Sequence, residues 1–185
     1  MKKIAIVYTL IFVGLFSCNE ESSETGKPSV EELKEIITQK EDSLMLFQKE
    51  NKIIPDTKHY DLIHALLNFY YKYPQDAYAP VCLDKVQMSY SGLGIYFKAV
   101  QFADSLIDKY PKYVNRQMVL ESQASNFDIF LEPRDTNKVK HYYSILLKEN
   151  PKLEKDKRAG IEMRLKHLDL NMDQYIEFLS KNIHQ

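Results

Sequence analysis

Three similar stretches recur along the chain and decide its fold: Phe69-Tyr-Tyr-Lys-Tyr-Pro74, Leu106-Ile-Asp-Lys-Tyr-Pro111 and Leu146-Leu-Lys-Glu-Asn-Pro151. Each stretch ends an amphipathic segment, and its proline marks the end of a helix because proline cannot continue helical hydrogen bonding. The three prolines are 37 and 40 residues apart. A repeat of this length predicts helical hairpins that stack on one another.

The middle unit shows the expected hairpin most clearly. Residues 79–91 predict one helix, with apolar side chains at helical spacing: Leu83, Val86 and Tyr90. Gly92-Leu93-Gly94 predicts a turn between the two helices. It does not predict a phosphate-binding loop, because no strand precedes it and the lysine of such a loop is missing. Residues 95–110 predict the second helix, which should bury Ala99, Leu106 and either Phe102 or Ala103.

The flanking segments fit the same scheme. Ser29 and Glu32 have the spacing of a capping box, so a long helix should begin there and bury Val30, Leu33, Ile37, Leu44 and Phe47. Lys40 interrupts a heptad pattern, which favours ordinary packing over a coiled coil. Asp56 is expected to cap the next helix. The side chains of that helix that should face the core are Leu62, Leu66, Phe69 and Tyr73. Later helices are expected over residues 114–131, from residue 135, and over residues 156–168 and 172–183. The predicted fold is all-α, a short α-solenoid of antiparallel hairpins.

The middle unit resembles the tetratricopeptide repeat. With Pro111 as the closing proline, Ala99 falls on the small position of the second helix and Tyr90 on the aromatic position late in the first. Gln87 and Leu106 depart from the pattern, since the family has a small residue and an alanine there. The resemblance covers roughly residues 29–151 and implies a domain of this type over residues 29–185. A weaker likeness is to the D-subunit lipoproteins of outer-membrane β-barrel assembly machines, whose repeats also close with Tyr-Pro.

The beginning of the chain has the anatomy of a secretory signal peptide. Lys2 and Lys3 supply a positive start, residues 4–16 are mainly apolar, and Ser17-Cys18 places a small residue before a thiol. A helix over this apolar run reaches about 20 Å, which is short of the ~30 Å hydrocarbon core of a membrane. A cleaved leader over residues 1–17 is therefore favoured over a membrane span.

Leu15-Phe16-Ser17-Cys18 resembles the lipobox of bacterial lipoproteins, although Phe16 departs from the small residue usual there. The resemblance implies that Cys18 is acylated, becomes the first residue after cleavage, and anchors the protein in the outer membrane, at its periplasmic or cell-surface face. Acyl chains hold a protein on a membrane because each buried methylene contributes about 0.8 kcal/mol. The alternative is an ordinary signal peptide that leaves a free Cys18.

Residues 18–28 are expected to form a lipidated, flexible tether. Residues 19–27 carry no apolar side chain and so cannot bury surface. The acidic residues after Cys18 resemble the export signal of surface lipoproteins in Bacteroidetes-type bacteria, and a linker that is only soluble is the alternative.

Composition argues against several classes of function. The formal net charge is −1, and no basic stretch suggests nucleic-acid binding. Cys82 lies among Val81, Leu83 and Val86, which predicts a buried structural thiol. His59 and His64 are five residues apart and do not share a helical face. We find no motif that predicts a catalytic residue, a metal site or a cofactor.

In a helical-repeat scaffold, the first helix of each hairpin lines a concave groove. Six residues fall in this candidate partner-binding groove, which has an acidic character, and ordinary surface is the alternative for each of them: Val81, Asp84, Met88, Glu121, Ala124 and Asp128. The sequence thus predicts a membrane-tethered, non-catalytic scaffold that binds an envelope protein. The alternative is a lipoprotein that binds a small ligand or a glycan, for which the many tyrosines would stack on sugar rings.

Overall fold

The computed structural model describes residues 28–182. The predicted signal peptide, Cys18 and all of the predicted tether except Pro28 lie outside the described residues. Within the described range the secondary structure is entirely helical, and it runs α1 (Val30–Lys49), α2 (Asp56–Lys72), α3 (Ala79–Gly92), α4 (Tyr96–Lys109), α5 (Arg116–Ser125), a π-helical segment η1 (Asn126–Phe130), α6 (Thr136–Glu149), α7 (Lys155–Lys166) and α8 (Met172–Asn182). The predicted all-α class is confirmed.

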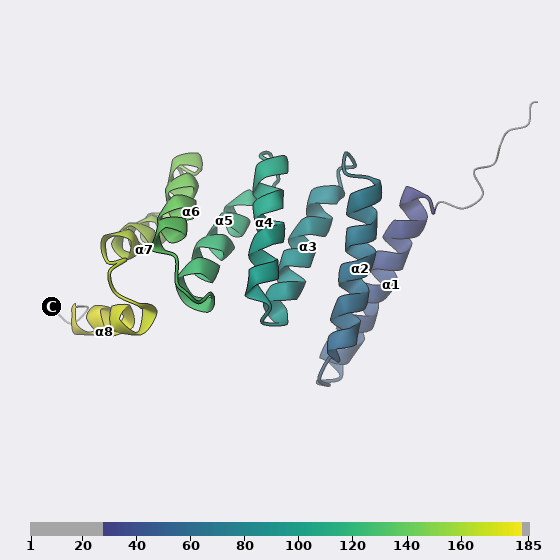
Figure 1. The fold of residues 1–185 in the computed structure, drawn as a ribbon, viewed down its shortest axis with the longest axis horizontal. Coiled ribbons are helices and arrows are strands. Elements are labelled where there is room, and N and C mark those ends of the chain that lie inside the picture. The colour runs from purple at the N-terminus through teal and green to yellow at the C-terminus, as the bar shows by residue number, and fades with distance from the viewer. Residues whose placement is uncertain (1–27, 183–185) are drawn as a thin grey trace, which may run out of the picture.

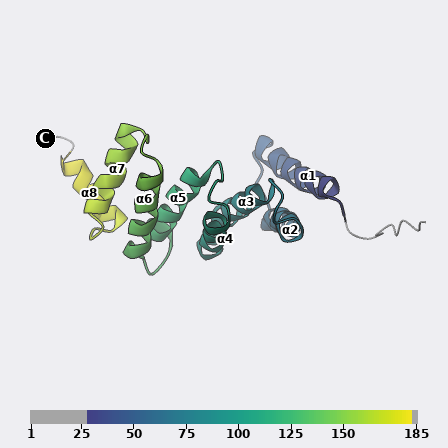
Figure 2. The ribbon, with the colours of Figure 1, turned by 90° about the horizontal axis from the view of Figure 1, so that it is seen from above.

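The helices form hairpins that follow one another in a row (Figure 1). Seen from above, α1, α3, α5 and α7 lie on one side of the row, and α2, α4 and α6 lie on the other (Figure 2). Helix α8 lies across the far end. The turns that follow α2, α4 and α6 share one edge of the row with the start of α1 (Figure 1). We call this the proline edge, because it holds Pro28, Pro74, Pro111 and Pro151.

The three proline turns have nearly the same backbone geometry. The residue before each proline ends its helix, with φ, ψ of −129°, 56° at Tyr73, −127°, 66° at Tyr110 and −118°, 70° at Asn150. Each of these residues donates its N–H to the carbonyl four residues earlier, over 2.9 to 3.0 Å. Its own carbonyl then accepts from the N–H three residues later, over 3.0 to 3.1 Å. The sequence repeat is therefore a structural repeat, as predicted.

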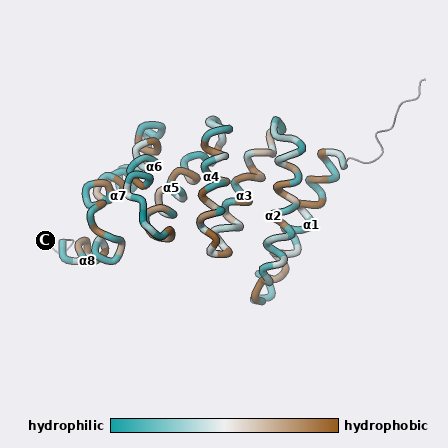
Figure 3. Tube along the Cα trace, viewed as in Figure 1, coloured by the Kyte–Doolittle hydropathy of each residue, from teal (hydrophilic) through white to brown (hydrophobic). Residues whose placement is uncertain are grey.

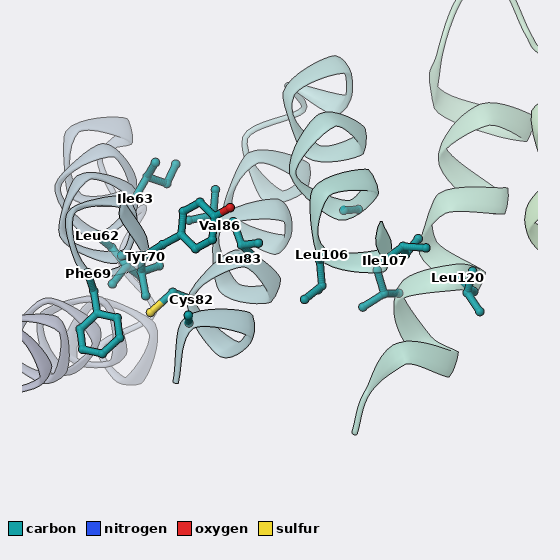
Figure 4. Packing of buried hydrophobic residues seen from close by; sticks show 14 of the residues in the cluster. Leu62, Ile63, Phe69, Tyr70, Cys82, Leu83, Val86, Leu106, Ile107 and Leu120 are labelled. Carbon is teal, nitrogen blue, oxygen red and sulfur yellow. The ribbon is translucent and has the colours of Figure 1, made fainter. Parts of the chain in front are cut away.

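A continuous core lies between the two rows of helices. In the hydropathy view, apolar and polar residues alternate along the helices of the whole stack (Figure 3), and buried apolar residues from each of α1 to α7 form one cluster. The close view shows α2 and α3 meeting around Phe69, Cys82 and Val86, with Leu106 of α4 extending the core within the α3–α4 hairpin (Figure 4). Cys82 is fully buried, as predicted. Each such aliphatic or aromatic side chain contributes about 1.5 to 3 kcal/mol of burial energy.

Helix boundaries confirm most of the predicted signals and correct two. Ser29 and Glu32 form the predicted capping box, with bonds of 2.7 Å from the Ser29 N–H and 3.2 Å to the Ser29 hydroxyl. Asp56 does not cap α2, since it is the first helical residue and Pro55 occupies the cap position. The helix predicted over residues 114–131 begins at Arg116 and widens into the π-helical segment after Ser125.

None of the helices within residues 28–182 combines the length and the apolar character needed to span a membrane.

Candidate partner-binding surface

The structure places the six predicted groove residues in different environments, beginning with Asp84. Its side chain is buried on α3 and accepts two hydrogen bonds, one from the Tyr113 hydroxyl over 2.8 Å and one from the Gln87 amide over 2.9 Å. Burial and the bond to Asp84 raise the pKa of Tyr113 to about 12. Asp84 therefore links α3 to the turn before α5, and its carboxylate is largely shielded from solvent.

Asp128 is also buried and belongs to an ionic cluster at the C-terminal end of the stack. Arg164 of α7 donates to both of its carboxylate oxygens, over 2.7 and 2.8 Å, and Arg134 donates to one of them over 2.8 Å. The Arg164 guanidinium also donates to the carbonyls of His167 and Leu170 and lies 4.6 Å from the ring centre of Tyr175. This carboxylate holds α7 and α8 against η1.

The other four predicted residues divide between core and surface. Ala124 is fully buried in the core. Glu121 pairs with Lys157 over 2.6 Å, Met88 is 61% exposed, and Val81 is half-buried. The six residues therefore do not form one exposed acidic surface. A helix in the middle of the stack packs against helices on both sides. A helix face that the sequence predicts to be exposed can therefore be buried by the next helix.

A hollow of which the predicted groove residues supply only Val81 opens at the proline edge. It has a volume of about 490 Å³ and is bounded by the start of α3 and the turn between α4 and α5. Its lining includes Ala77, Pro80, Val81, Tyr110, Tyr113 and Val114. Val114 is 87% exposed and lies beside the other apolar side chains of this lining. We call this site the Val114 hollow.

A second hollow adjoins the first, because Ala77, Pro80, Lys109 and Tyr110 line both. It has a volume of about 580 Å³ and adds polar groups and Tyr70 to the lining. The Lys109 ammonium donates to the Tyr70 hydroxyl over 2.7 Å, and this bond raises the pKa of Lys109. We call this site the Tyr70 hollow, and the two together form a continuous depression along the edge.

The next repeat has an equivalent hollow with a different lining. It has a volume of about 490 Å³ and lies around Pro151, the residue that matches Pro111. Two glutamates, Glu149 and Glu154, stand where the Val114 hollow has Lys109 and Val114. Arg116 holds Glu149 in an ion pair of 2.7 Å. Two turns of the same geometry are therefore lined by different side chains, mainly apolar ones in one repeat and mainly polar or charged ones in the other.

The described residues contain no group of three or more His, Cys, Asp and Glu side chains that could hold a metal ion. Burial raises the pKa of the Cys82 thiol to about 12, so this side chain stays protonated at neutral pH. The two hollows at the proline edge offer apolar side chains, aromatic rings and charged groups.

The sequence contained a signal for the Val114 hollow, because an apolar residue follows each of two proline turns at matching positions, Ala77 and Val114.

Comparison with protein-family models, with curated proteins and with solved structures finds no match to this chain.

Proposed function

We propose that this protein is a non-catalytic scaffold of the cell envelope, tethered to the outer membrane through a lipid on Cys18, that holds a partner protein at its proline edge. The observation that supports the proposal is the Val114 hollow, where apolar side chains line a depression and Val114 lies almost fully in solvent. Exposed apolar surface that is gathered into one depression is typical of protein interfaces.

The fold suits this role in two ways. The helical stack presents a preformed surface, so a partner pays little of the entropy cost of ordering the scaffold when it binds. Tethering adds effective concentration, because two molecules confined to one membrane meet more often than free molecules do. Pro28, the first described residue, lies at the same edge as the hollow, since Tyr73 donates to its carbonyl over 3.1 Å. Pro28, the last residue of the predicted tether, and the proposed site thus share one edge.

The second candidate, binding of a small ligand or a glycan, is supported by the Tyr70 hollow. Its lining combines aromatic rings with hydrogen-bonding side chains, among them Gln75, Asp76 and Lys109. Sugars bind through such combinations of stacking and hydrogen bonding.

Site-specific photo-crosslinking in intact cells tests the proposed scaffold. A photoreactive amino acid is placed at Val114 in the lipidated protein and, as a control, at Ile176 of α8, which is 58% exposed and far from the hollow. We expect a defined envelope protein to be captured from position 114 and not from position 176, and to be lost when Cys18→Ala removes the lipid.

The opposite result would reject the scaffold. If position 114 captures no reproducible protein, and envelope glycans raise the melting temperature in a thermal-shift screen, the ligand-binding function replaces it.

A further inference from the structure

We infer that the Val114 hollow binds an extended segment of its partner in which an apolar side chain lies beside a carboxylate. This inference rests on the proposed scaffold function and specifies the chemistry of the partner. Three features of the hollow carry it: two lysines without acidic partners at its rim, tyrosine hydroxyls that are already occupied, and a lining that the next repeat does not share.

The rim of the hollow carries positive charge that the described part of the chain does not balance. Lys109 and Lys112 line the hollow and are exposed, and neither forms an ion pair with another described residue. No acidic residue lines the Val114 hollow, and the one acid in the adjoining hollow, Asp76, already pairs with Lys34 over 3.6 Å. A partner carboxylate here would meet two ammonium groups that retain free donors.

The tyrosines around the hollow offer their rings and not their hydroxyls. The Tyr110 hydroxyl donates to the Pro74 carbonyl over 2.7 Å, and the Tyr113 hydroxyl donates to Asp84 over 2.8 Å. Tyr70 accepts the hydrogen bond from Lys109. Because these bonds fix the rings and use the hydroxyls, the hollow presents rigid apolar faces next to Val81 and Val114. These rings favour an apolar side chain over a sugar, whose hydroxyls would find no hydrogen-bond partner on the ring faces.

The lining is specific to one repeat, which argues that it is not a by-product of the fold. At matching positions the next repeat has Glu149 for Lys109, Asn150 for Tyr110 and Glu154 for Val114, and it keeps a lysine, Lys152, for Lys112. The backbone geometry of the turn is nevertheless the same. The turn therefore requires neither Lys109 nor the exposed valine, whereas a lysine directly after the proline occurs in both repeats.

The occupant we assign is a partner protein and not the N-terminal segment of this chain. Residues 19–27 contain Glu20, Glu21 and Glu24, which would satisfy the lysines. They contain no apolar side chain, however, and so would leave the apolar lining of the hollow in contact with water.

A displayed random-peptide library, selected on the lipidated protein in detergent, tests the assignment. We expect the enriched peptides to combine apolar residues with Asp or Glu and to bind more weakly as salt is raised. The double variant Lys109→Glu/Lys112→Glu should weaken their binding by about tenfold, as expected for two exposed charge contacts that become repulsive. The matched control Lys49→Glu/Lys140→Glu makes the same charge change at exposed lysines that line none of the hollows and should bind as the wild type does.

Enriched peptides without acidic residues, or equal binding by the two double variants, would overturn the inference. Equal melting temperatures of the two variants show that any loss is not caused by unfolding. If Val114 still captures an envelope protein in cells while the charge reversal has no effect, the scaffold function stands and only the partner chemistry is wrong. If no protein is captured, the scaffold function itself fails.

Discussion

The hydroxyl of Tyr110 donates a 2.7 Å hydrogen bond to the carbonyl of Pro74, which closes the preceding repeat. Tyr73 makes the same contact one repeat earlier, with the carbonyl of Pro28 over 3.1 Å. The tyrosine of each Tyr-Pro pair thus joins its turn to the turn before it. Asn150 replaces this tyrosine in the last repeat and bonds instead to Leu146 of its own helix, over 2.9 Å. The series of contacts therefore ends where the sequence motif ends.

Tyr110→Phe should destabilise the fold modestly, because it removes one hydrogen bond between repeats and keeps the ring. We expect a loss of about 0.5 to 1 kcal/mol, at the low end for a hydrogen bond because water reaches the freed carbonyl. Urea denaturation followed by circular dichroism measures it. Tyr71→Phe serves as the control, since Tyr71 is 68% exposed and makes no hydrogen bond through its hydroxyl to another described residue. Equal stability of the two variants would show that the contact contributes nothing.

Asp128→Asn should be far more damaging. The substitution leaves the guanidinium of Arg164 on α7 buried without a negative partner. Breaking a buried ion pair in this way should lower the free energy of unfolding by about 3 to 5 kcal/mol. Glu121→Gln, which breaks the more exposed pair with Lys157, should cost less than about 1 kcal/mol. Denaturation measures the two losses, and hydrogen exchange should show α7 and α8 losing protection first in Asp128→Asn. Similar losses in both variants would contradict the central role of Asp128.

Asp128 also shows what the sequence could and could not predict. The proline spacing and the Ser29–Glu32 capping box are local signals, and they predicted the hairpins and the start of α1 correctly. The burial of Asp128 depends on Arg164, which is 36 residues away in the chain. Helical periodicity reports which face of a helix a residue occupies, but not which distant side chain covers that face.

The Val114 hollow and the π-helical segment escaped prediction for related reasons. The hollow forms between the start of α3 and a turn more than 25 residues later, so it exists only once the repeats are stacked. In the π-helical segment, Phe127 packs against Tyr142 of α6 with ring centres 5.8 Å apart. That contact belongs to tertiary packing, and the sequence of residues 126–130 carries no periodic signal for it.

Tyr113 should make the fold sensitive to alkaline pH. Burial, followed by its bond to Asp84, raises its pKa from 10 in the unfolded chain to about 12 in the fold. Below pH 10 both states keep the proton and the contribution of Tyr113 to stability is complete. Between pH 10 and 12 the unfolded chain loses its proton first, so the free energy of unfolding falls as pH rises.

The measurement is the free energy of unfolding in urea across this pH range. Tyr113→Phe should be less stable than the wild type at pH 7, because Asp84 loses a donor, by about 1 to 3 kcal/mol. Its stability should then fall less steeply between pH 10 and 12, although other buried tyrosines with a raised pKa, such as Tyr143, still contribute. Parallel curves for the variant and the wild type would show that Tyr113 does not titrate as the structure implies.

The two glycines of the turn between α3 and α4 should respond to alanine with opposite signs. Gly94 has a φ of +71°, and the turn closes with the Gly94 N–H on the Ser91 carbonyl over 3.0 Å and the Ile95 N–H on the Tyr90 carbonyl over 2.9 Å. This is the Schellman arrangement, which needs a left-handed residue after the helix. Gly94→Ala should therefore cost about 1 to 2 kcal/mol of backbone strain.

Gly92 is the last residue of α3 and has no left-handed φ, so Gly92→Ala should stabilise the fold by about 0.4 to 1 kcal/mol by restricting the unfolded chain. An added Cβ meets no atom within 4 Å at either position, so packing does not confuse the comparison. Urea denaturation of both variants decides it, and a loss of stability in both would show that the backbone conformation of Gly92 also requires glycine.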